Sequence, residues 1–418
     1  MIETTVLDKV AFYSKDRIKA SQVSIDDFIT TDNILQNKTG IIKSIINPKG
    51  TLIKFEKGDV LVGNIRPYLK KIWFADKNGG CSPDVLVFKS KPGYDNEFLY
   101  YSLFRDDFFI HMMKGKKGTK MPRGDKDQIL NFIISDFSLP VQKKTAEVLS
   151  TLDYKILHNK KINEELESLA KIIYDYWFVQ FDFPNAKGKP YKSSGGKMVW
   201  SEKLKREIPE GWEVGTLLNI AEYINGLPCQ KFRPTGNDFL RVIKIKEMHE
   251  GYSSESELVR ADIPKKAIIE NGDVLFSWSA SLEVQIWTRG KGALNQHIFK
   301  VISDEYPRSF YYYQLVNYLQ HFKMMAATRK TTMGHITQEH LQQSRIAIPP
   351  KELTLELEKI IAPIFAKKLN NEIENQKLSE LRDWLLPMLM NGQVKVKDAE
   401  EMLAMAAEPK EEYLTKKK

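Results

Sequence analysis

The sequence predicts an α+β protein made of two copies of one domain-sized unit. Each copy has a globular α/β part followed by a long helix of coiled-coil type. Three observations predict this fold class: a repeated six-residue stretch, a collinear series of matches around it, and a 3,4-spaced stripe at the end of each copy.

The repeated stretch is "EKGDVL" at Glu56–Leu61 and "ENGDVL" at Glu270–Leu275, 214 positions apart. An Ile-Trp pair follows each stretch at the same offset, and further matches continue at offset 212 as far as Leu166 and Leu378. A period of this size is far longer than a solenoid repeat, so it indicates two copies of a whole domain.

The globular part of each copy mixes short apolar runs, such as "DVLVFK" and "HIFKVI", with Gly, Pro, Asn and Asp. This pattern is typical of short strands joined by turns. The segments "EFLYYSLFRDDFFIHMMK" and "SFYYYQLVNYLQHFKMM" are predicted to be helices inside these parts.

Near the end of each copy, mostly apolar residues recur at alternating steps of three and four. This spacing keeps one face of a helix toward a partner helix. Asn159 and Asn371 take equivalent places in it, where a polar residue costs stability but fixes register. The alternative is that both helices simply cover a core. The residues predicted to pack are Leu149, Leu152, Ile156, Asn159, Leu166, Leu169 and Ile173 in the first copy, and Ile364, Asn371, Leu378, Leu381 and Leu385 in the second.

Composition shifts divide the chain further. A stretch rich in Gly, Pro, Ser and Lys separates the copies and is predicted to be a linker. The expected parts are a globular domain at 1–140, a helix at 141–178, the linker at 179–211, a second globular domain at 212–350, a second helix at 351–395 and a tail at 396–418.

The net charge and the cysteine content indicate what kind of partner and compartment to expect. The net charge is +9, and the last 21 residues hold four lysines and six acids, so the rest of the chain carries +11. Such a surplus favours a polyanionic partner. Cys81 and Cys229 lack CxxC spacing and are expected to be free thiols in a reducing compartment, the cytoplasm. No apolar run is long enough for a membrane span.

Motifs of catalysis are missing from the sequence. There is no GxxxxGK[ST], GxGxxG or HExxH pattern, and no Asn/Asp-Pro-Pro-aromatic loop of an adenine methyltransferase. "SPDVLVFK" resembles a nuclease metal motif, but Val87 stands where a carboxylate is needed. His335 and His340 are five apart, which is poor spacing for a metal site. We therefore expect a binding protein without a catalytic or metal site.

Cations gather at the same place in both copies, within "MMKGKKGTKMPRGDK" and "KMMAATRKTTMGHIT". Backbone amides, hydroxyls and cations of such loops can reach phosphates, and Arg or Lys can read guanine edges. The alternative is a solvated basic loop. The candidate DNA-binding residues are Lys116, Lys117, Thr119, Lys120 and Arg123 in the first copy, and Arg329, Lys330, Thr331, Thr332 and His335 in the second.

A second candidate segment is "GNIRPYLKK", which contains Asn64, Arg66, Lys70 and Lys71. Arg66 joins the candidate DNA-binding residues. The counterpart in the second copy, "SWSASLEVQ", lacks these cations. Two copies that differ where side chains would reach bases should read two different half-sites.

The first helix is long enough to act as a spacer. From Leu149 to Tyr176 it has 28 residues, or about 42 Å at ~1.5 Å per residue. One turn of DNA is about 34 Å, so this length suits two readers on one face of a duplex.

The chain resembles the specificity subunit of type I restriction–modification systems. The resemblance spans nearly all of the chain and is carried above all by "FDFPNAKGKPYKSSGGKMVWSEKL", "IPEGWEV" and "KLSELRDWLLPMLMNGQV". It implies two target-recognition domains that each read half of an interrupted double-stranded DNA target. It also implies two helices that pack antiparallel as the spacer.

The resemblance further implies two modification subunits on the helices and two restriction subunits around that core. S-adenosylmethionine would then bind the modification subunits, and ATP and Mg the restriction subunits, with no cofactor in this chain. The rival interpretations are an enzyme with drifted motifs and a coiled-coil adaptor that does not bind DNA.

Overall fold

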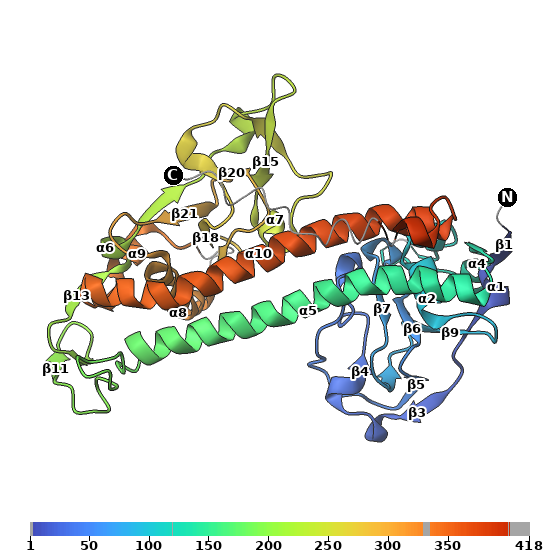
Figure 1. Ribbon diagram of the computed structural model, residues 1–418, viewed down its shortest axis with the longest axis horizontal. Coiled ribbons are helices and arrows are strands. Elements are labelled where there is room, and N and C mark those ends of the chain that lie inside the picture. Colours follow the sequence, from blue (N-terminus) through green and yellow to red (C-terminus); the bar gives the residue numbers. More distant parts are fainter. Residues whose placement is uncertain (1–2, 119, 329–334, 400, 402–418) are drawn as a thin grey trace. The chain divides into compact units, whose positions relative to one another are not determined.

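The computed structural model describes residues 3–118, 120–328, 335–399 and 401 (Figure 1). The chain forms two compact units, the first from residues 1–155 and 378–418 and the second from 156–377. Two long helices, α5 (Leu139–Phe178) and α10 (Lys351–Met390), each contribute to both units. Because the units divide inside these helices, the domain boundaries expected from the sequence stay a prediction.

The described residues of the first unit form two four-stranded sheets and one strand pair. The first sheet has the order β2 (Ala11–Tyr13), β9 (Val85–Ser90), β6 (Val60–Gly63), β7 (Ile72–Phe74). The second has the order β3 (Arg17–Lys19), β5 (Thr51–Phe55), β8 (Gly79–Cys81), β4 (Phe28–Ile29). The pair is β1 (Thr4–Val6) with β10 (Ile133–Ser135), and the short helices are α1 (Leu7–Val10), α2 (Asn96–Phe104), α3 (Asp106–Lys114) and α4 (Lys126–Leu130).

The second unit repeats the first sheet and the strand pair of the first unit. Its second sheet differs, because the outermost strand attaches at the opposite edge. Its first sheet has the order β14 (Glu222–Asn225), β21 (Ile298–Ile302), β18 (Val274–Ser277), β19 (Glu283–Ile286). Its second has the order β16 (Leu258–Arg260), β15 (Phe239–Ile243), β20 (Gly292–Leu294), β17 (Ile268–Ile269). The strand pair is β13 (Glu213–Thr216) with β22 (Arg345–Ile348), and the helices are α6 (Leu217–Ile220), α7 (Ile245–Glu250), α8 (Arg308–Thr328) and α9 (Gln338–Gln343).

The central strand of the first sheet is buried on both faces, which explains its continuous apolar run. Val60 and Val62 of β6 pack into one core, while Leu61 between them packs into a second core with Trp73. Successive side chains of a strand point to opposite faces. In the second unit, Val274 and Phe276 of β18 likewise pack on one side and Leu275 on the other. The predicted duplication and mixed α/β content are confirmed.

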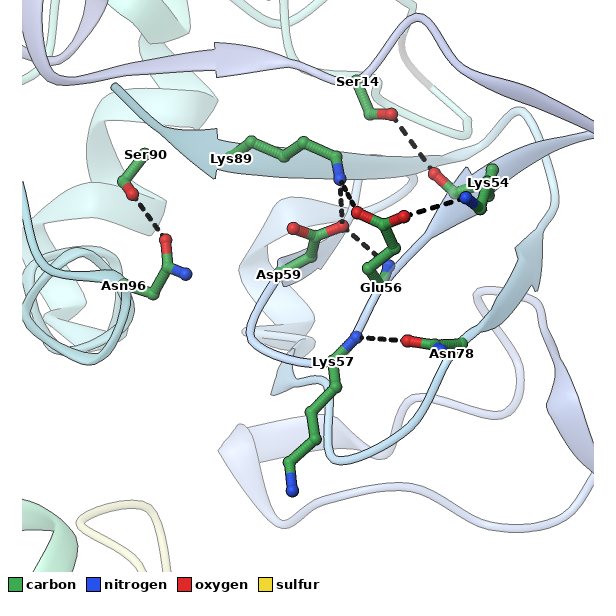
Figure 2. A network of polar contacts seen from close by, with 9 residues as sticks. All are labelled: Ser14, Lys54, Glu56, Lys57, Asp59, Asn78, Lys89, Ser90 and Asn96. Atoms are coloured by element: carbon green, nitrogen blue, oxygen red, sulfur yellow. Dashed lines mark hydrogen bonds and ion pairs between the residues drawn. The ribbon is translucent and has the colours of Figure 1, made fainter. Parts of the chain in front are cut away.

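The repeated Gly-Asp pair has the same structural role in both units. Gly58 and Gly272 have positive φ angles of 93° and 96°, which suit glycine. The Asp59 carboxylate accepts a hydrogen bond from the Glu56 amide (2.8 Å) and pairs with Lys89 (3.2 Å), as Figure 2 shows. The equivalent Asp273 accepts from the Glu270 amide (2.8 Å) and pairs with Lys300 (2.7 Å).

Within the second unit, α5 and α10 run antiparallel. Asn159 contacts Asn375, and Asn163 contacts Asn371. Residue numbers along α10 therefore decrease as those along α5 increase. Further along, Glu167 forms an ion pair with Lys368. Within the first unit, Asp153 of α5 pairs with Arg382 of α10 at 2.6 Å, in the same antiparallel sense.

The packed stripe of α5 steps 3,4,3,4 from Leu149 through Leu152, Ile156, Asn159, Asn163, Leu166 and Ala170 to Ile173. The prediction that Leu169 packs is wrong, because this side chain is 47% exposed. Its neighbour Ala170 is fully buried instead. The packed stripe includes the polar Asn163. A prediction from hydropathy prefers the neighbouring apolar Ile162, and this choice leads to Leu169 in place of Ala170.

On α10 the same alternation runs through Ile364, Lys368, Asn371, Asn375, Leu378, Arg382 and Leu385. Leu381 and Leu378 are partly buried against the core of the first unit. Offset 212 relates Asn163 to Asn375 just as it relates Asn159 to Asn371, so the two helices carry equivalent stripes.

The predicted linker at 179–211 is folded. It contains a hairpin of β11 (Met198–Ser201) and β12 (Arg206–Pro209). Phe181 and Phe183 are buried in the core of the second unit, where the ring of Phe183 stacks on Trp212 at a centroid distance of 5.6 Å.

Candidate nucleic-acid interface

Three loops meet at one face of the first unit. The Asn64 amide, just after β6, donates to the carbonyl of Asp84, just before β9 (2.9 Å). The Arg66 amide donates to the Pro122 carbonyl (2.7 Å), and the Gly124 amide to the Asn64 carbonyl (3.3 Å). The two candidate segments that the sequence analysis treated separately therefore form one face.

Five of the predicted cations lie exposed on these loops: Arg66, Lys116, Lys117, Lys120 and Arg123. Two are paired with carboxylates, Lys117 with Asp125 (2.5 Å) and Arg123 with Asp84 (3.1 Å). The other three make no ion pair within the described part of the chain, so their charge is open to a ligand.

The pair of Lys117 and Asp125 changes the pKa of both groups. The hydrogen bond to Asp125 raises the pKa of the Lys117 ammonium, and the same bond lowers the pKa of the Asp125 carboxyl. Both shifts favour the charged forms, so the loop keeps its ion pair at neutral pH.

Lys70 and Lys71 serve the structure of the unit. Lys70 pairs with Asp106 (2.8 Å), and Lys71 is buried and donates to the Thr31 carbonyl. Burial lowers the pKa of the Lys71 ammonium. Asn64 is buried as well. Of the segment "GNIRPYLKK", Arg66 alone stays a candidate DNA contact.

The second unit joins the equivalent loops in the same way. The Trp278 amide, after β18, donates to the His297 carbonyl before β21 (3.4 Å), and the Ile336 amide donates to the Trp278 carbonyl (2.9 Å). Offsets of 214, 213 and 212 relate Trp278, His297 and Ile336 to Asn64, Asp84 and Gly124 of the first unit, respectively.

Aromatic and imidazole rings occupy this face of the second unit. The Trp278 ring lies 5.6 Å from the ring of His297 and 5.5 Å from that of His335, and both histidines are exposed. Arg329, Lys330, Thr331 and Thr332 lie outside the described residues, as does Thr119 of the first unit.

Sequence reasoning missed a backbone feature shared by the two faces. Arg66 has φ of 52° and Ala280 has φ of 58°, in the left-handed region that few non-glycine residues adopt. They are equivalent at offset 214. Alignment of the two copies would have pointed to Trp278 and His297 as the counterparts of Asn64 and Asp84. The left-handed conformation at Arg66 and Ala280 has no signal in the sequence.

The two faces can bind a nucleic acid by different means. Unpaired lysines and arginines neutralise phosphates, and an arginine can bind guanine through two hydrogen bonds. The exposed histidine rings, and the accessible part of the half-buried Trp278 ring, can contact bases or sugar groups. Among the described residues, no group of three His, Cys, Asp or Glu side chains could hold a metal ion. No helix in this part of the chain is long and apolar enough to cross a membrane.

Comparison with known protein families gives the class of this protein. The family described as "Type I restriction modification DNA specificity domain" matches the chain twice, at residues 8–168 and 209–383. The two matches correspond to the two copies. The chain belongs to this family of type I restriction–modification specificity proteins, which accounts for two DNA-reading domains in one chain.

Individual relatives agree with this assignment. The chain is 25% identical over 435 aligned positions to the HindI specificity subunit of Haemophilus influenzae, covering 88% of this chain and 94% of that protein. It is 28% identical to the MjaIX specificity subunit of Methanocaldococcus jannaschii, covering 74% and 71%. The fold is similar to a crystal structure of the S subunit of M. genitalium, with a TM-score of 0.54, 15% identity and coverage of 93% and 96%.

Proposed function

We propose that this chain is the DNA-reading subunit of a type I restriction–modification complex, and that each unit reads one half of an interrupted duplex target. The single observation that carries the proposal is that equivalent loops meet in both units but present different side chains. A common backbone positions the reader, and the side chains select the bases.

The two half-sites are expected to differ. The first face offers Arg66, Lys116 and Lys120, whose charges suit phosphates and guanine edges. The second offers the rings of Trp278, His297 and His335, which suit base and sugar contacts. This difference supports an asymmetric target.

The long helices are proposed to act as the spacer and as the platform for partners. The part of α5 from Leu149 to Tyr176 has 28 residues. It spans ~42 Å, compared with ~34 Å for one turn of DNA. In this proposal two modification subunits hold the helices, and two restriction subunits join that core in the cytoplasm.

The chain itself is proposed to be non-catalytic. S-adenosylmethionine would bind the modification subunits, while ATP and Mg would bind the restriction subunits. The absence of catalytic motifs from the sequence and the membership of a specificity family support this division of labour.

The test is binding of the full chain, with and without its modification subunits, to random duplex over a range of salt concentrations. A DNA reader gives a linear fall of log K with log salt. An adaptor would give no binding in either form, and an enzyme would turn over substrate without the partner subunits.

A further inference from the structure

A group of four buried asparagines joins the long helices inside the second unit. Asn159 and Asn163 come from α5, and Asn371 and Asn375 from α10; all four are almost fully buried. Each helix carries its pair four residues apart, so both amides of a pair lie on one helix face. We name this group the asparagine quartet.

Hydrogen bonds connect the quartet across the two helices. Asn371 Nδ2 donates to Asn163 Oδ1 (2.8 Å), and Asn159 Nδ2 donates to Asn375 Oδ1 (3.0 Å). Asn159 Nδ2 also donates to Glu374 (2.8 Å), and Asn163 Nδ2 to Glu372 (3.0 Å). Asn163 reaches the backbone as well, at the Lys368 carbonyl (3.3 Å).

These contacts exist in one axial register only. Ile364 lies seven residues before Asn371 on α10, and Leu378 lies seven residues after it. A slip of one heptad in either direction would place one of these apolar side chains opposite Asn163. An amide that is buried against such a side chain loses its partner, which is strongly unfavourable. The quartet therefore discriminates between registers that an apolar seam would accept.

Apolar packing supplies a competing constraint. The core of the second unit includes Tyr174 of α5 and Phe365 of α10, so both helices also pack against the globular part. This burial is non-directional, whereas the amide hydrogen bonds require one pairing. The two constraints make different predictions when the amides are removed.

We propose that the asparagine quartet sets the axial register of α5 against α10 and thereby selects the gap between the two half-sites. This inference rests on the proposed function, because the gap has meaning only if each unit reads a half-site. A slip of one heptad moves one helix by ~10 Å along the other, which corresponds to about three base pairs of duplex at ~3.4 Å each.

The register can be measured without DNA. The variant E167C/K368C places two thiols at the ends of an observed ion pair. The native cysteines interfere little, since both are buried and burial raises the pKa of Cys81 to about 12 and of Cys229 to about 11. A short bifunctional thiol reagent, which spans the distance that the Glu and Lys side chains fill, should cross-link the pair efficiently.

Adding N163L/N371L to that background should lower the cross-link yield several-fold, because other registers become populated. An exposed asparagine on the same helix provides the control, and N370L should leave the yield unchanged. An unchanged yield in folded N163L/N371L would overturn the proposal. If that double variant fails to fold, N371L alone is used with the same two outcomes.

The second measurement is methylation by the full chain with its modification subunits. The substrates are duplexes that keep both half-sites and vary the gap by up to about four base pairs. Wild type and N370L should methylate one gap length, whereas N163L/N371L should gain at least ~10-fold on a gap changed by about three base pairs. Unchanged gap selection contradicts the role of the quartet, while no methylation by wild type on any duplex contradicts the proposed function instead.

Discussion

At the scale of single residues, the two reading faces share a backbone and differ in side chains. Arg66 and Ala280 hold the same left-handed conformation in their units. For a residue other than glycine this conformation costs about 1–3 kcal/mol, so the surrounding loops must impose it twice. The loop shape is therefore common to both units, and in the proposed function the side chains that it carries select the bases.

Removing the unpaired cations of the first face tests the electrostatic part of the account. The variant R66A/K116A/K120A should bind duplex DNA more weakly. The slope of log K against log salt should fall by about one for each lost phosphate contact. The exposed Lys49 lies outside the face, and K49A should keep the wild-type slope. A wild-type slope in the triple variant would place the DNA elsewhere.

A residue-scale prediction concerns pH. Hydrogen bonds and ion pairs with Lys54 and Lys89 lower the pKa of Glu56 from 4.5 to about 2. A lowered folded-state pKa stabilises the fold at pH above 4.5, and that contribution is lost as pH falls from 4.5 toward 2. In E56Q, unfolding by denaturant should depend less on pH across this window.

Because the Glu56 side chain is about half exposed, salt should screen its pairs, and the difference between wild type and E56Q should shrink at 1 M salt. If the two proteins lose stability in parallel between pH 4.5 and 2 at low salt, these pairs do not contribute.

At the scale of elements, hydropathy predicts the two long helices and most of their packed residues. It fails at Asn163 and Asn375, because a buried asparagine has the same polarity as an exposed one until its partner is known. The consequence is a stripe displaced by one residue, which places the exposed Leu169 in the seam. Only the fold reveals that Asn371 satisfies Asn163.

In the first unit, an ion pair joins the two helices beside their shared apolar core. Asp153 accepts hydrogen bonds from Arg382 (2.6 Å) and from the Tyr101 hydroxyl (2.8 Å). At offset 212 the equivalent positions are Phe365 and Ala170, which belong to the apolar core of the second unit. Equivalent stripes thus use different chemistry at their two ends.

A double-mutant cycle measures this charged contact. D153A should cost about 1–3 kcal/mol, since it removes the interhelical partner of the mostly buried Arg382 and leaves it only its neighbour Asp383. Because the residues interact directly, D153A/R382A should cost less than the sum of the single variants, with a coupling of about 0.5–3 kcal/mol. Strictly additive free energies of unfolding would show that the pair contributes nothing.

At the scale of the whole molecule, the duplication is readable from the sequence because structural residues repeat. The Gly-Asp turn, the two-faced central strand and the asparagine positions of the helical stripes each keep their chemistry at offsets of 212 to 214. The reading faces are less predictable, because their side chains differ between copies and depend on loops that meet only in the fold. The separate basic segments of the first unit could not be joined without the contact between Arg66 and Pro122.

The central claim is that each unit reads its own half of one target. Selection of bound sequences from a random duplex library, with the full chain and its modification subunits, tests this claim most directly. Wild type should select two different short sequences at a fixed gap, R66A/K116A/K120A should relax only one of them, and W278A/H335A only the other. Recovery of one uninterrupted sequence, or relaxation of both halves by either variant, would contradict the account.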